Sequence, residues 1–284
     1  MSFLYFVLPA LGGYTLTSLY LLKNPHVLHK RKCTAFWARH ISHRGGCGER
    51  IESTMEAFTN AVEQGTQMLE MDCHLTKDRH VVVSHDENLL RQTGLDATIS
   101  SLTLQDLPLY KEKLEVTFNQ GHYSSGSDRQ IALLEDVFRK FPKMPISIEI
   151  KEDNDQLIKE NDALPHSFSI IKGVLLLLLF YTGLLPFVPL KESILHFYLP
   201  RVMNRTFISE ERIFRNNLVV CLLDKLTMRR SLLKHLAARG IQVHLFVCNS
   251  DEDIKTAIDL GATGVMTDYP TLLTNYLCRN NDLN

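Results

Sequence analysis

The sequence predicts an α/β protein built as a TIM-type (β/α) barrel that lacks one strand unit and carries an N-terminal transmembrane helix. Strand-like apolar runs alternate with helix-like segments along most of the 284 residues, which is typical of a parallel sheet. Polar signatures stand at or near the ends of several of these runs. In a parallel barrel the C-terminal strand ends meet at one mouth, so such side chains would converge there.

Length and composition allow one barrel or two smaller domains. Hydrophobic residues make up 45% of the chain and charged residues 22%, which is ordinary for a chain with a sizeable core. The formal net charge of −1 gives no general attraction to nucleic acid, so we expect no nucleic-acid partner. The six cysteines form no C-x-x-C pair, which indicates reduced thiols rather than a disulfide framework or a zinc site.

Residues 1–22 are expected to form a transmembrane anchor. The stretch FLYFVLPALGGYTLTSLYLL has 20 residues without a charge, about the length that crosses ~30 Å of hydrocarbon. A signal peptide is the competing interpretation, but the stretch has no basic region before it and no clear cleavage site after it. Residues 23–39 form a basic juxtamembrane segment, which by the positive-inside rule places the following domain in the cytosol.

The strands are expected at residues 41–44, 67–75, 80–84, 145–150, 166–171, 242–248 and 264–267. Helices are expected at residues 53–64, 132–141, 227–239 and 252–260. In the first helix the apolar residues 55, 58 and 62 recur at helical spacing and Gly65 ends it; Gly240 ends the helix at 227–239 in the same way. The Gly- and Ser-rich stretch 119–128 is expected to be a surface excursion.

A second apolar run covers residues 174–190, with the sequence VLLLLLFYTGLLPFVPL. Its 17 residues are at the lower limit for a membrane span, and Gly183, Pro186 and Pro189 interrupt it. It could be a short span, a segment that dips into the membrane, or a buried barrel helix. A span would put the later strands across the membrane from the first ones, so we favour a membrane-dipping segment at the rim of the barrel.

Four polar signatures carry the chemistry: His43-Arg44-Gly45-Gly46, Glu70-Met71-Asp72, His85-Asp86 and Glu149-Ile150-Lys151. Strand alternation points Glu70 the same way as Asp72, and Glu149 the same way as Lys151. Each of these residues taken alone could be a solvated strand end or a surface ion pair. Together they supply three carboxylates, two imidazoles and two cations, which is the composition of a metal-assisted phosphate site.

With the late stretch GATGVMTDYP, these signatures resemble the glycerophosphodiester phosphodiesterase family of TIM barrels, over roughly residues 40–273. The anchor and the internal apolar run make the chain most similar to the membrane-anchored branch of that family, whose members act as lysophospholipases D. The resemblance implies a barrel over residues 40–284 and attachment to the endoplasmic reticulum or perinuclear membrane.

The resemblance also implies roles for individual residues. By the family's motifs, the metal ligands would be Glu70, Asp72 and Glu149. The catalytic histidines would be His43 and His85. The groups that bind the substrate phosphate would be Arg44 and Lys151. The carboxylates would hold one divalent ion, Mg²⁺ or Ca²⁺, because hard cations prefer oxygen ligands. Asp86 is a candidate orienting partner for an imidazole, whereas His74 and Cys47 are expected to be structural.

The expected reaction is hydrolysis of a phosphodiester in a lysophospholipid, which releases lysophosphatidic acid and the headgroup alcohol. Glycerophosphodiesters are possible further substrates. Two alternatives stay open: a catalytically impaired isoform that binds lipid, and a cleavage like that of phospholipase C. The sequence indicates no oligomeric state.

The chain departs from the family pattern in three places. Ser53 stands where many members have asparagine, and Phe246 where they often have tryptophan. More seriously, only 15 residues lie between Lys151 and Ser167 of the next predicted strand. A full unit there would need a helix, a strand and a second helix, and a βαβ crossover alone takes about a dozen residues or more. The sequence therefore predicts seven strands rather than eight and a barrel with unpaired edges.

Overall fold

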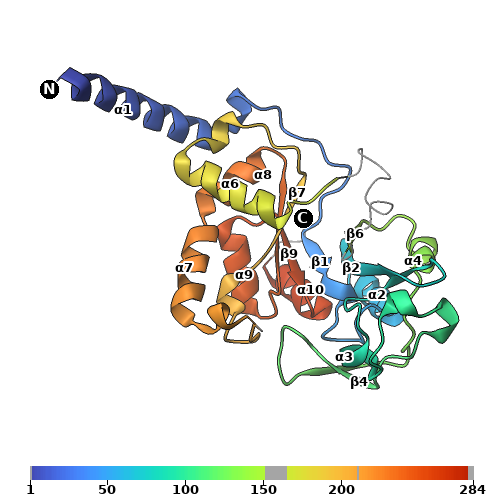
Figure 1. The fold of residues 1–284 in the computed structure, drawn as a ribbon. Coiled ribbons are helices and arrows are strands. Elements are labelled where there is room, and N and C mark those ends of the chain that lie inside the picture. The colour runs from blue at the N-terminus through green and yellow to red at the C-terminus, as the bar shows by residue number, and fades with distance from the viewer. Residues whose placement is uncertain (1, 151–164, 210, 281–284) are drawn as a thin grey trace.

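The computed structural model describes residues 2–150, 165–209 and 211–280 (Figure 1). Its centre is a curled sheet of parallel strands, which confirms the predicted fold class. The parallel order is β6 (Ile146–Ile150), β2 (Met68–Leu75), β1 (His40–Ser42), β9 (Gly264–Thr267), β8 (Gln242–Phe246) and β7 (Ile194–Tyr198). β3 (Val81–Val83) pairs antiparallel with the end of β2.

Helices cover the outside of this sheet, as expected for βα units. They are α2 (Met55–Glu63), α3 (Leu90–Thr93), α4 (Leu134–Lys140), α6 (Ile170–Thr182), α7 (Asn217–Thr227), α8 (Arg230–Ala238), α9 (Asp251–Leu260) and α10 (Pro270–Arg279). Side-chain caps begin four of them, α2, α6, α7 and α9. The capping residues that accept a backbone N–H are Thr54, Ser169, Asn216 and Ser250. A small hairpin pairs β4 (Lys113–Glu115) with β5 (Tyr123–Ser125), and only β5 lies within the predicted surface excursion 119–128.

The sheet is open between β6 and β7. Among the described residues, no strand pairing joins these two strands, and β6 is bonded only to β2. Ile148 is 38% exposed and Glu149 is exposed as well, as expected for an edge strand. The described strands therefore form an open, curled half-barrel, which confirms the prediction that one strand unit is missing after residue 151.

One predicted strand is wrong, and one strand was missed. Residues 166–171 make only a single bridge, from Ser167 to Ile194, and α6 begins at Ile170 with Ser169 as its N-cap. A helix begins here because the Ser169 side chain caps it by accepting from the Lys172 N–H, and the apolar run from Val174 continues it. The strand at this place in the sheet is β7, which was not predicted from the sequence.

The segment before α8 also differs from the prediction. Residues 227–239 were expected to form one helix, but α7 ends at Thr227 and α8 begins at Arg230. The chain turns at Met228, whose backbone (φ −83°, ψ 59°) is not helical. The apolar residues before Thr227 thus belong to a separate helix, α7, that the sequence pattern did not reveal.

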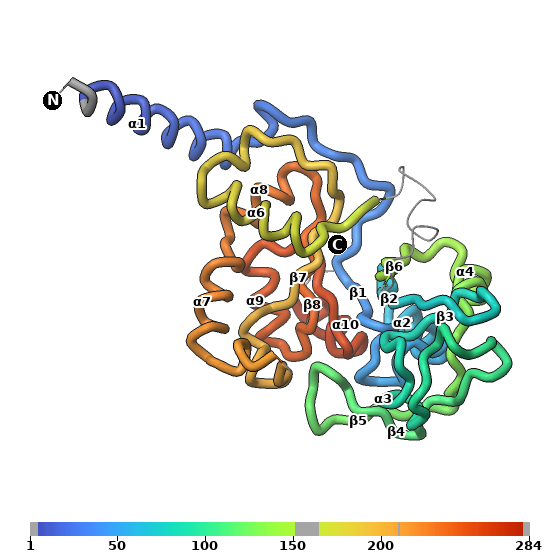
Figure 2. Tube along the Cα trace, in the orientation of Figure 1, coloured from blue at the N-terminus to red at the C-terminus, as the bar shows by residue number. Residues whose placement is uncertain are grey.

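The N-terminal helix α1 (Ser2–Lys23) projects from the body of the molecule (Figures 1 and 2). Its segment Tyr5–Lys23 is the one helix among the described residues that is long and apolar enough to cross a membrane, with a mean hydropathy of 1.3. The hydroxyls of Tyr14 and Ser18 donate to the carbonyls of Thr182 and Gly183, each at 2.6 Å. α1 therefore satisfies carbonyls at the C-terminal end of α6, which a helix leaves without internal partners.

Candidate active site

The candidate site lies at the C-terminal ends of the strands, around a pocket of about 290 Å³. Its lining combines charged and apolar side chains: His43, Arg44, Asp72, His85, Phe118, Glu149, Tyr198, Val202, Met203, Phe207 and Phe246. Glu70 lies directly behind the pocket and accepts from the Arg44 N–H at 2.9 Å. The structure thus brings the predicted site residues together, except Lys151, which lies outside the described residues.

Arg44 occupies the centre of the polar half of the pocket. It sits on the short turn η2 (His43–Gly45) after β1, with a positive φ of 47° that a residue other than glycine adopts only at a cost. Its side chain is 1% exposed, and its Nη1 donates to Glu52 Oε2 at 3.2 Å. Gly46 lets this turn close, because a Cβ there would lie 2.4 Å from Pro270 Cγ.

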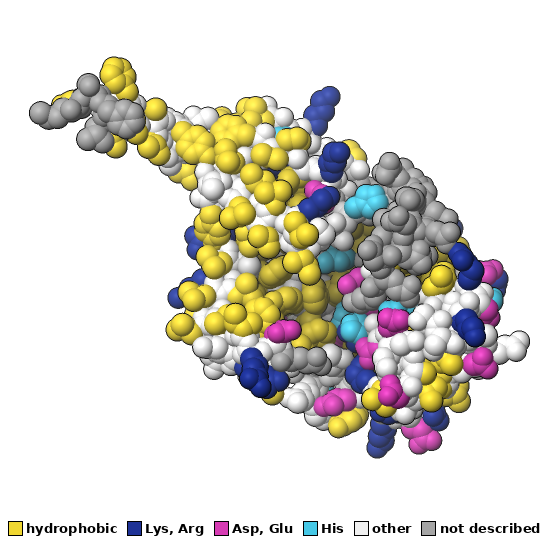
Figure 3. Space-filling model, in the orientation of Figure 1, with side chains coloured by type: hydrophobic (Ala, Val, Ile, Leu, Met, Phe, Trp, Pro, Cys, Tyr) yellow, Lys and Arg dark blue, Asp and Glu magenta, His cyan; other side chains and the backbone are white. Residues whose placement is uncertain are grey.

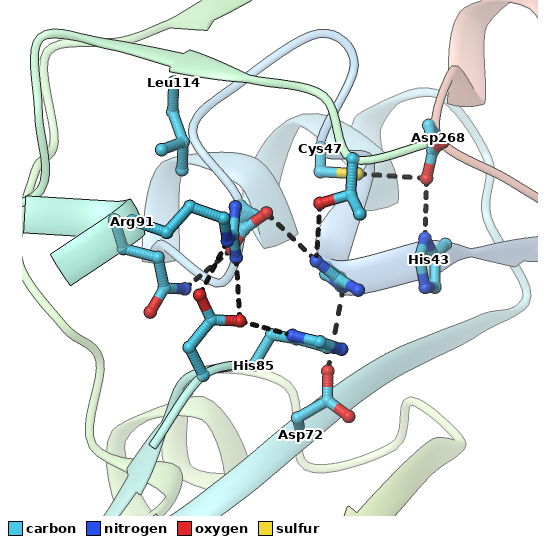
Figure 4. A network of polar contacts seen from close by, with 12 residues as sticks. His43, Cys47, Asp72, His85, Arg91, Leu114 and Asp268 are labelled. Atoms are coloured by element: carbon cyan, nitrogen blue, oxygen red, sulfur yellow. Dashed lines mark hydrogen bonds and ion pairs between the residues drawn. The ribbon is translucent and has the colours of Figure 1, made fainter. Parts of the chain in front are cut away.

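A continuous network connects Arg44 to His85 (Figure 4). Glu52 Oε1 accepts from Arg91 Nη2 at 2.6 Å, and Arg91 Nε donates to Asp86 Oδ2 at 2.6 Å. Asp86 Oδ1 in turn accepts from His85 Nδ1 at 2.6 Å, which is the orienting contact expected for Asp86. A ring held at Nδ1 in this way exchanges protons with other groups through Nε2.

His43 is held in the same manner by a residue from the far end of the chain. Its Nδ1 lies 2.6 Å from Asp268 Oδ1, just after β9, and Asn249 Nδ2 donates to the other Asp268 oxygen at 2.6 Å. Burial lowers the pKa of His43, but the charge and hydrogen bond of Asp268 outweigh it, so the pKa is raised overall. The two imidazoles of the site are therefore each oriented by one carboxylate.

Cys47 also contacts Asp268, and it behaves as the sequence predicted. Its Sγ lies 3.0 Å from Asp268 Oδ1. Burial, followed by the charge of Asp268, raises the pKa of this thiol well above its usual value. His43, Cys47 and Asp268 are close enough to hold a metal ion by distance alone. A thiol that stays protonated is a poor ligand, so this cluster acts as a hydrogen-bonded support for His43.

Three carboxylates form the possible metal site. Oxygens of Glu70, Asp72 and Glu149 all lie within 4.8 Å of one another. The register explains this, because β2 places Glu70 and Asp72 on one face and pairs Asp72 with Glu149 across to β6. Burial and the charge of Asp72 raise the pKa of Glu70 to about 7. An oxygen-only set of crowded carboxylates fits a hard divalent cation, whose charge would relieve that repulsion.

Aromatic side chains form the apolar half of the pocket. The Phe118 and Phe246 rings lie against His43, with centroid distances of 5.6 and 6.2 Å. Phe207 packs on Phe118 at 4.7 Å. Phe246 therefore keeps the apolar bulk expected at a position where relatives often carry tryptophan. Ser53 adopts a φ of 60°, and its buried Oγ has no hydrogen-bond partner among the described residues. It therefore makes no side-chain hydrogen bond in place of the asparagine that many relatives have at this position.

Comparison with known proteins decides the family. The family model described as "Glycerophosphoryl diester phosphodiesterase family" matches residues 43–178 and 189–272. The chain belongs to this family. Its members are phosphodiesterases, and the match includes every described site residue. The unmatched residues 179–188 cover the end of α6 and the loop after it.

Curated relatives of the family align over nearly the whole chain. Lysophospholipase D GDPD3 from Homo sapiens is 44% identical over 304 aligned positions, which cover 96% of each protein. Lysophospholipase D GDPD1 from Homo sapiens is 45% identical, again over 96% of each. An alignment of 304 positions exceeds the 284 residues of this chain, so at least 20 positions of the relative have no counterpart here. That deficit agrees with the open sheet.

Solved structures of the family share the fold. The glycerophosphodiester phosphodiesterase from Thermotoga maritima aligns with a TM-score of 0.55 at 23% identity, covering 84% of this chain and 97% of that one. A phosphodiesterase from Oleispira antarctica, solved in complex with the product sn-glycerol-3-phosphate, aligns with a TM-score of 0.53 at 19% identity over 86% of this chain and 98% of that one.

The residues that support the catalytic side chains through hydrogen bonds and ion pairs were not predicted from the sequence. Asp268 belongs to the family stretch GATGVMTDYP, and its place directly after a strand was a signal that could have marked it. Glu52 precedes Ser53 in the sequence, and no local pattern marks it as a partner of Arg44. Arg91 lies on α3, outside every predicted strand and helix, so the local pattern indicates no contact with Glu52.

Glu52→Gln tests the buried support of Arg44. Burial raises the pKa of Glu52, but Arg44 and Arg91 outweigh it and lower the pKa from 4.5 to about 2. A lowered pKa stabilises the fold above pH 4.5, and this contribution is lost as the pH falls toward 2. We expect the variant to lose about 3 kcal/mol of unfolding free energy at pH 7, measured by urea unfolding, and the difference from wild type to shrink below pH 4.5.

The matched control for this variant is Glu112→Gln, because the Glu112 side chain is 85% exposed and pairs with Arg129 at the surface. It should cost less than about 1 kcal/mol. A Glu52→Gln effect as small as the control, or one that does not change with pH, would contradict the assignment.

Asp268→Asn tests whether Asp268 positions His43 for phosphodiester hydrolysis. The variant keeps the size of the side chain but removes the charge that orients and stabilises the imidazolium. We expect kcat to fall about 10²- to 10⁴-fold with KM little changed, measured with a lysophospholipid substrate. Asp251→Asn, at an exposed pair with Arg279, is the control and should leave both constants as in wild type. An equal loss from both variants would refute the positioning role.

Proposed function

We propose that this protein is a metal-dependent lysophospholipase D, which releases lysophosphatidic acid and the headgroup alcohol. The observation that supports it most is the arrangement of the pocket. Two carboxylate-oriented imidazoles, a buried arginine and three clustered carboxylates form one half, and aromatic side chains form the other. The polar half suits a phosphodiester and the apolar half suits the lipid attached to it. Glycerophosphodiesters are further candidate substrates.

His43 and His85 act as the general base and the general acid. One imidazole takes the proton from the free glycerol hydroxyl next to the phosphate, and that oxygen attacks phosphorus. The other imidazole protonates the headgroup oxygen as its bond to phosphorus breaks. Water then opens the resulting cyclic phosphodiester to give lysophosphatidic acid. Diacyl lipids lack the free hydroxyl and are not substrates by this route.

Arg44 binds the substrate phosphate through its planar guanidinium, and Lys151 is proposed as a second phosphate contact. Glu70, Asp72 and Glu149 would hold one Mg²⁺ or Ca²⁺ ion. When bound, that ion supplies positive charge that neutralises the phosphodiester and favours attack at phosphorus. Arg44 remains charged in the folded protein, because the carboxylates of Glu52 and Asp72 outweigh its burial and raise its pKa.

The membrane arrangement supports a lipid substrate. Residues 1–22 serve as an anchor, followed by the basic segment 23–39 and by the barrel over residues 40–284 on the cytosolic side of the endoplasmic reticulum or perinuclear membrane. A cleaved signal peptide would not pack against the folded domain, whereas Ser18 of α1 bonds to Gly183. The strands before and after α6 share one sheet, so the run 174–190 returns to the side it left and dips into the membrane rather than crossing it.

One observation favours a second candidate, a catalytically impaired isoform that binds lipid. Glu149, a proposed metal ligand, stands on the exposed edge strand β6 beside the opening of the sheet. An edge strand is held on one side only, so Glu149 is positioned less firmly than Glu70 and Asp72 in β2. Activity measurements separate this candidate from the enzyme.

The direct test uses the full chain with lysophosphatidylcholine and Mg²⁺ or Ca²⁺. We expect release of choline and lysophosphatidic acid, no turnover of diacyl phosphatidylcholine, and loss of activity with a chelator. His43→Ala should lower kcat at least about 10³-fold, because it removes one of the two proton-transfer groups. His122→Ala, at an exposed histidine outside the pocket, is the control and should retain full activity.

Each other outcome identifies an alternative. Release of phosphocholine would show a cleavage like that of phospholipase C. Equal turnover of the diacyl and lyso forms would exclude attack by the neighbouring hydroxyl. Binding of lysophosphatidylcholine without turnover would indicate the impaired isoform.

A further inference from the structure

Helix α7 presents an apolar stripe to solvent. Leu218, Leu222 and Leu226 follow one another at intervals of four and are 70%, 52% and 50% exposed. Cys221 lies in the same stripe and is exposed too. The opposite side of the helix is buried through Val220 and packs toward the barrel. An exposed stripe of this length is unusual for a helix that meets only water.

Helix α6 presents a second stripe beside the first. Its exposed residues also recur at helical spacing and are Ile170, Ile171, Val174, Leu175, Leu178 and Tyr181, between 49% and 88% exposed. The Tyr181 hydroxyl donates to the Leu226 carbonyl at 2.8 Å, which joins α6 to α7. Figure 3 shows the hydrophobic side chains of this region gathered over α6 and α7 on one face of the molecule.

The N-terminal helix indicates what covers this face. Tyr14 and Ser18 of α1 bond to the end of α6, so the candidate membrane span and the apolar face are continuous. A helix that enters a bilayer there brings its attached neighbours to the lipid surface. α6 has 13 residues, about 20 Å of helix, which is too short to cross ~30 Å of hydrocarbon. It can instead lie along the interface.

Charge around α7 matches an anionic lipid surface. Residues 211–230 contain five lysines and arginines against two carboxylates. One of those carboxylates, Asp224, is paired with Arg201 at 3.1 Å. Arg212, Arg215, Lys225, Arg229 and Arg230 are all exposed. Basic residues that flank an apolar stripe are typical of interfacial helices on anionic membranes.

The same helix is tied to the apolar wall of the pocket. Asn204 Nδ2 donates to the Phe214 carbonyl and to Asn217 Oδ1, each at 2.9 Å, and so fastens the loop after η6 (Pro200–Val202) to the start of α7. This loop carries Met203 and Phe207, which line the pocket, and the next residue, Ile208, is 52% exposed. Apolar side chains thus lead from the α7 face to the site.

We propose that α6 and α7 form a membrane-docking face that lies in the anionic leaflet beside α1, and that lysophospholipid passes from this face into the pocket along Ile208, Phe207 and Met203. The passage of substrate rests on the proposed function, whereas the docking itself does not. α6 and α7 then act as one surface, and the expected membrane-dipping segment is only half of it.

Bilayer contact is measured with a fluorophore on Cys221. In the full chain with Cys33→Ser and Cys278→Ser, Cys221 is the exposed thiol left among the described cysteines. Bimane at Cys221 is read in vesicles of phosphatidylcholine and phosphatidylserine with nitroxide-labelled lipid. Its emission should fall at least about twofold relative to unlabelled vesicles, because an interfacial helix buries its apolar face ~5–10 Å into the lipid. The control carries bimane at Cys278 on α10, with Cys33→Ser and Cys221→Ser, and should be unaffected.

The path to the pocket is tested by Leu218→Asp with Leu222→Asp in the vesicle-bound full chain. Hydrolysis of lysophosphatidylcholine in vesicles should fall at least about tenfold, while hydrolysis of soluble glycerophosphocholine stays as in wild type. Leu109→Asp, 51% exposed and away from this face, is the matched control and should change neither rate. Both aspartates replace exposed residues, and thermal unfolding checks that the fold is kept.

Equal quenching at Cys221 and Cys278 would overturn the docking face. Equal loss on the vesicle and soluble substrates, or no loss on either, would overturn the passage of substrate along it. If the wild type hydrolyses neither substrate, the proposed function fails, and the quenching experiment still decides the docking.

Discussion

The rest of the site depends on the ion pairs of the buried Arg44 side chain. Arg44 is 1% exposed, and its guanidinium pairs with Glu52 at 3.2 Å and with Asp72 at 3.8 Å. A buried cation is costly unless it is paired, and both carboxylates are needed here for other contacts as well. Its backbone N–H donates to Glu70, so one residue carries the proposed phosphate contact and also positions a proposed metal ligand. The pairing of Glu52 with Arg91 then extends this order to Asp86 and His85.

Because the sheet is open, Glu149 is positioned less firmly than the other residues of the site. Among the described residues β6 pairs with β2 alone, and the pocket that Glu149 lines is also lined by Tyr198 of β7. Burial lowers the pKa of His196 on β7 to about 4, and the charge of Glu149 opposes that shift. A cation bound among Glu70, Asp72 and Glu149 would tie β6 to β2 through side chains as well as backbone. Metal binding and the stability of this edge are therefore expected to be coupled.

Much of the fold and site could be predicted because the decisive signals are local. Strand alternation alone predicts that Glu70 and Asp72 share one face of the sheet. The number of residues between Lys151 and the next predicted strand is too small for a full strand unit, which predicts that one is missing. What escaped prediction depends on contacts between distant segments. Asp268 meets His43 across 225 positions of sequence, and Arg91 meets Glu52 from a loop-like region. The helix α7 was missed because the predicted helix began only at residue 227, whereas α7 ends there and the turn at Met228 separates it from α8.

The central claim is that two oriented imidazoles drive attack by a hydroxyl of the substrate itself. It is tested most directly with a lysophosphatidylcholine analogue in which hydrogen replaces the free glycerol hydroxyl, so that the nucleophile is missing but the phosphodiester is intact. Choline release from the analogue and from the parent lipid is compared on the full chain. We predict that the analogue binds and inhibits but releases no choline. Choline release at a rate similar to that of the parent would contradict the account and require direct attack by water.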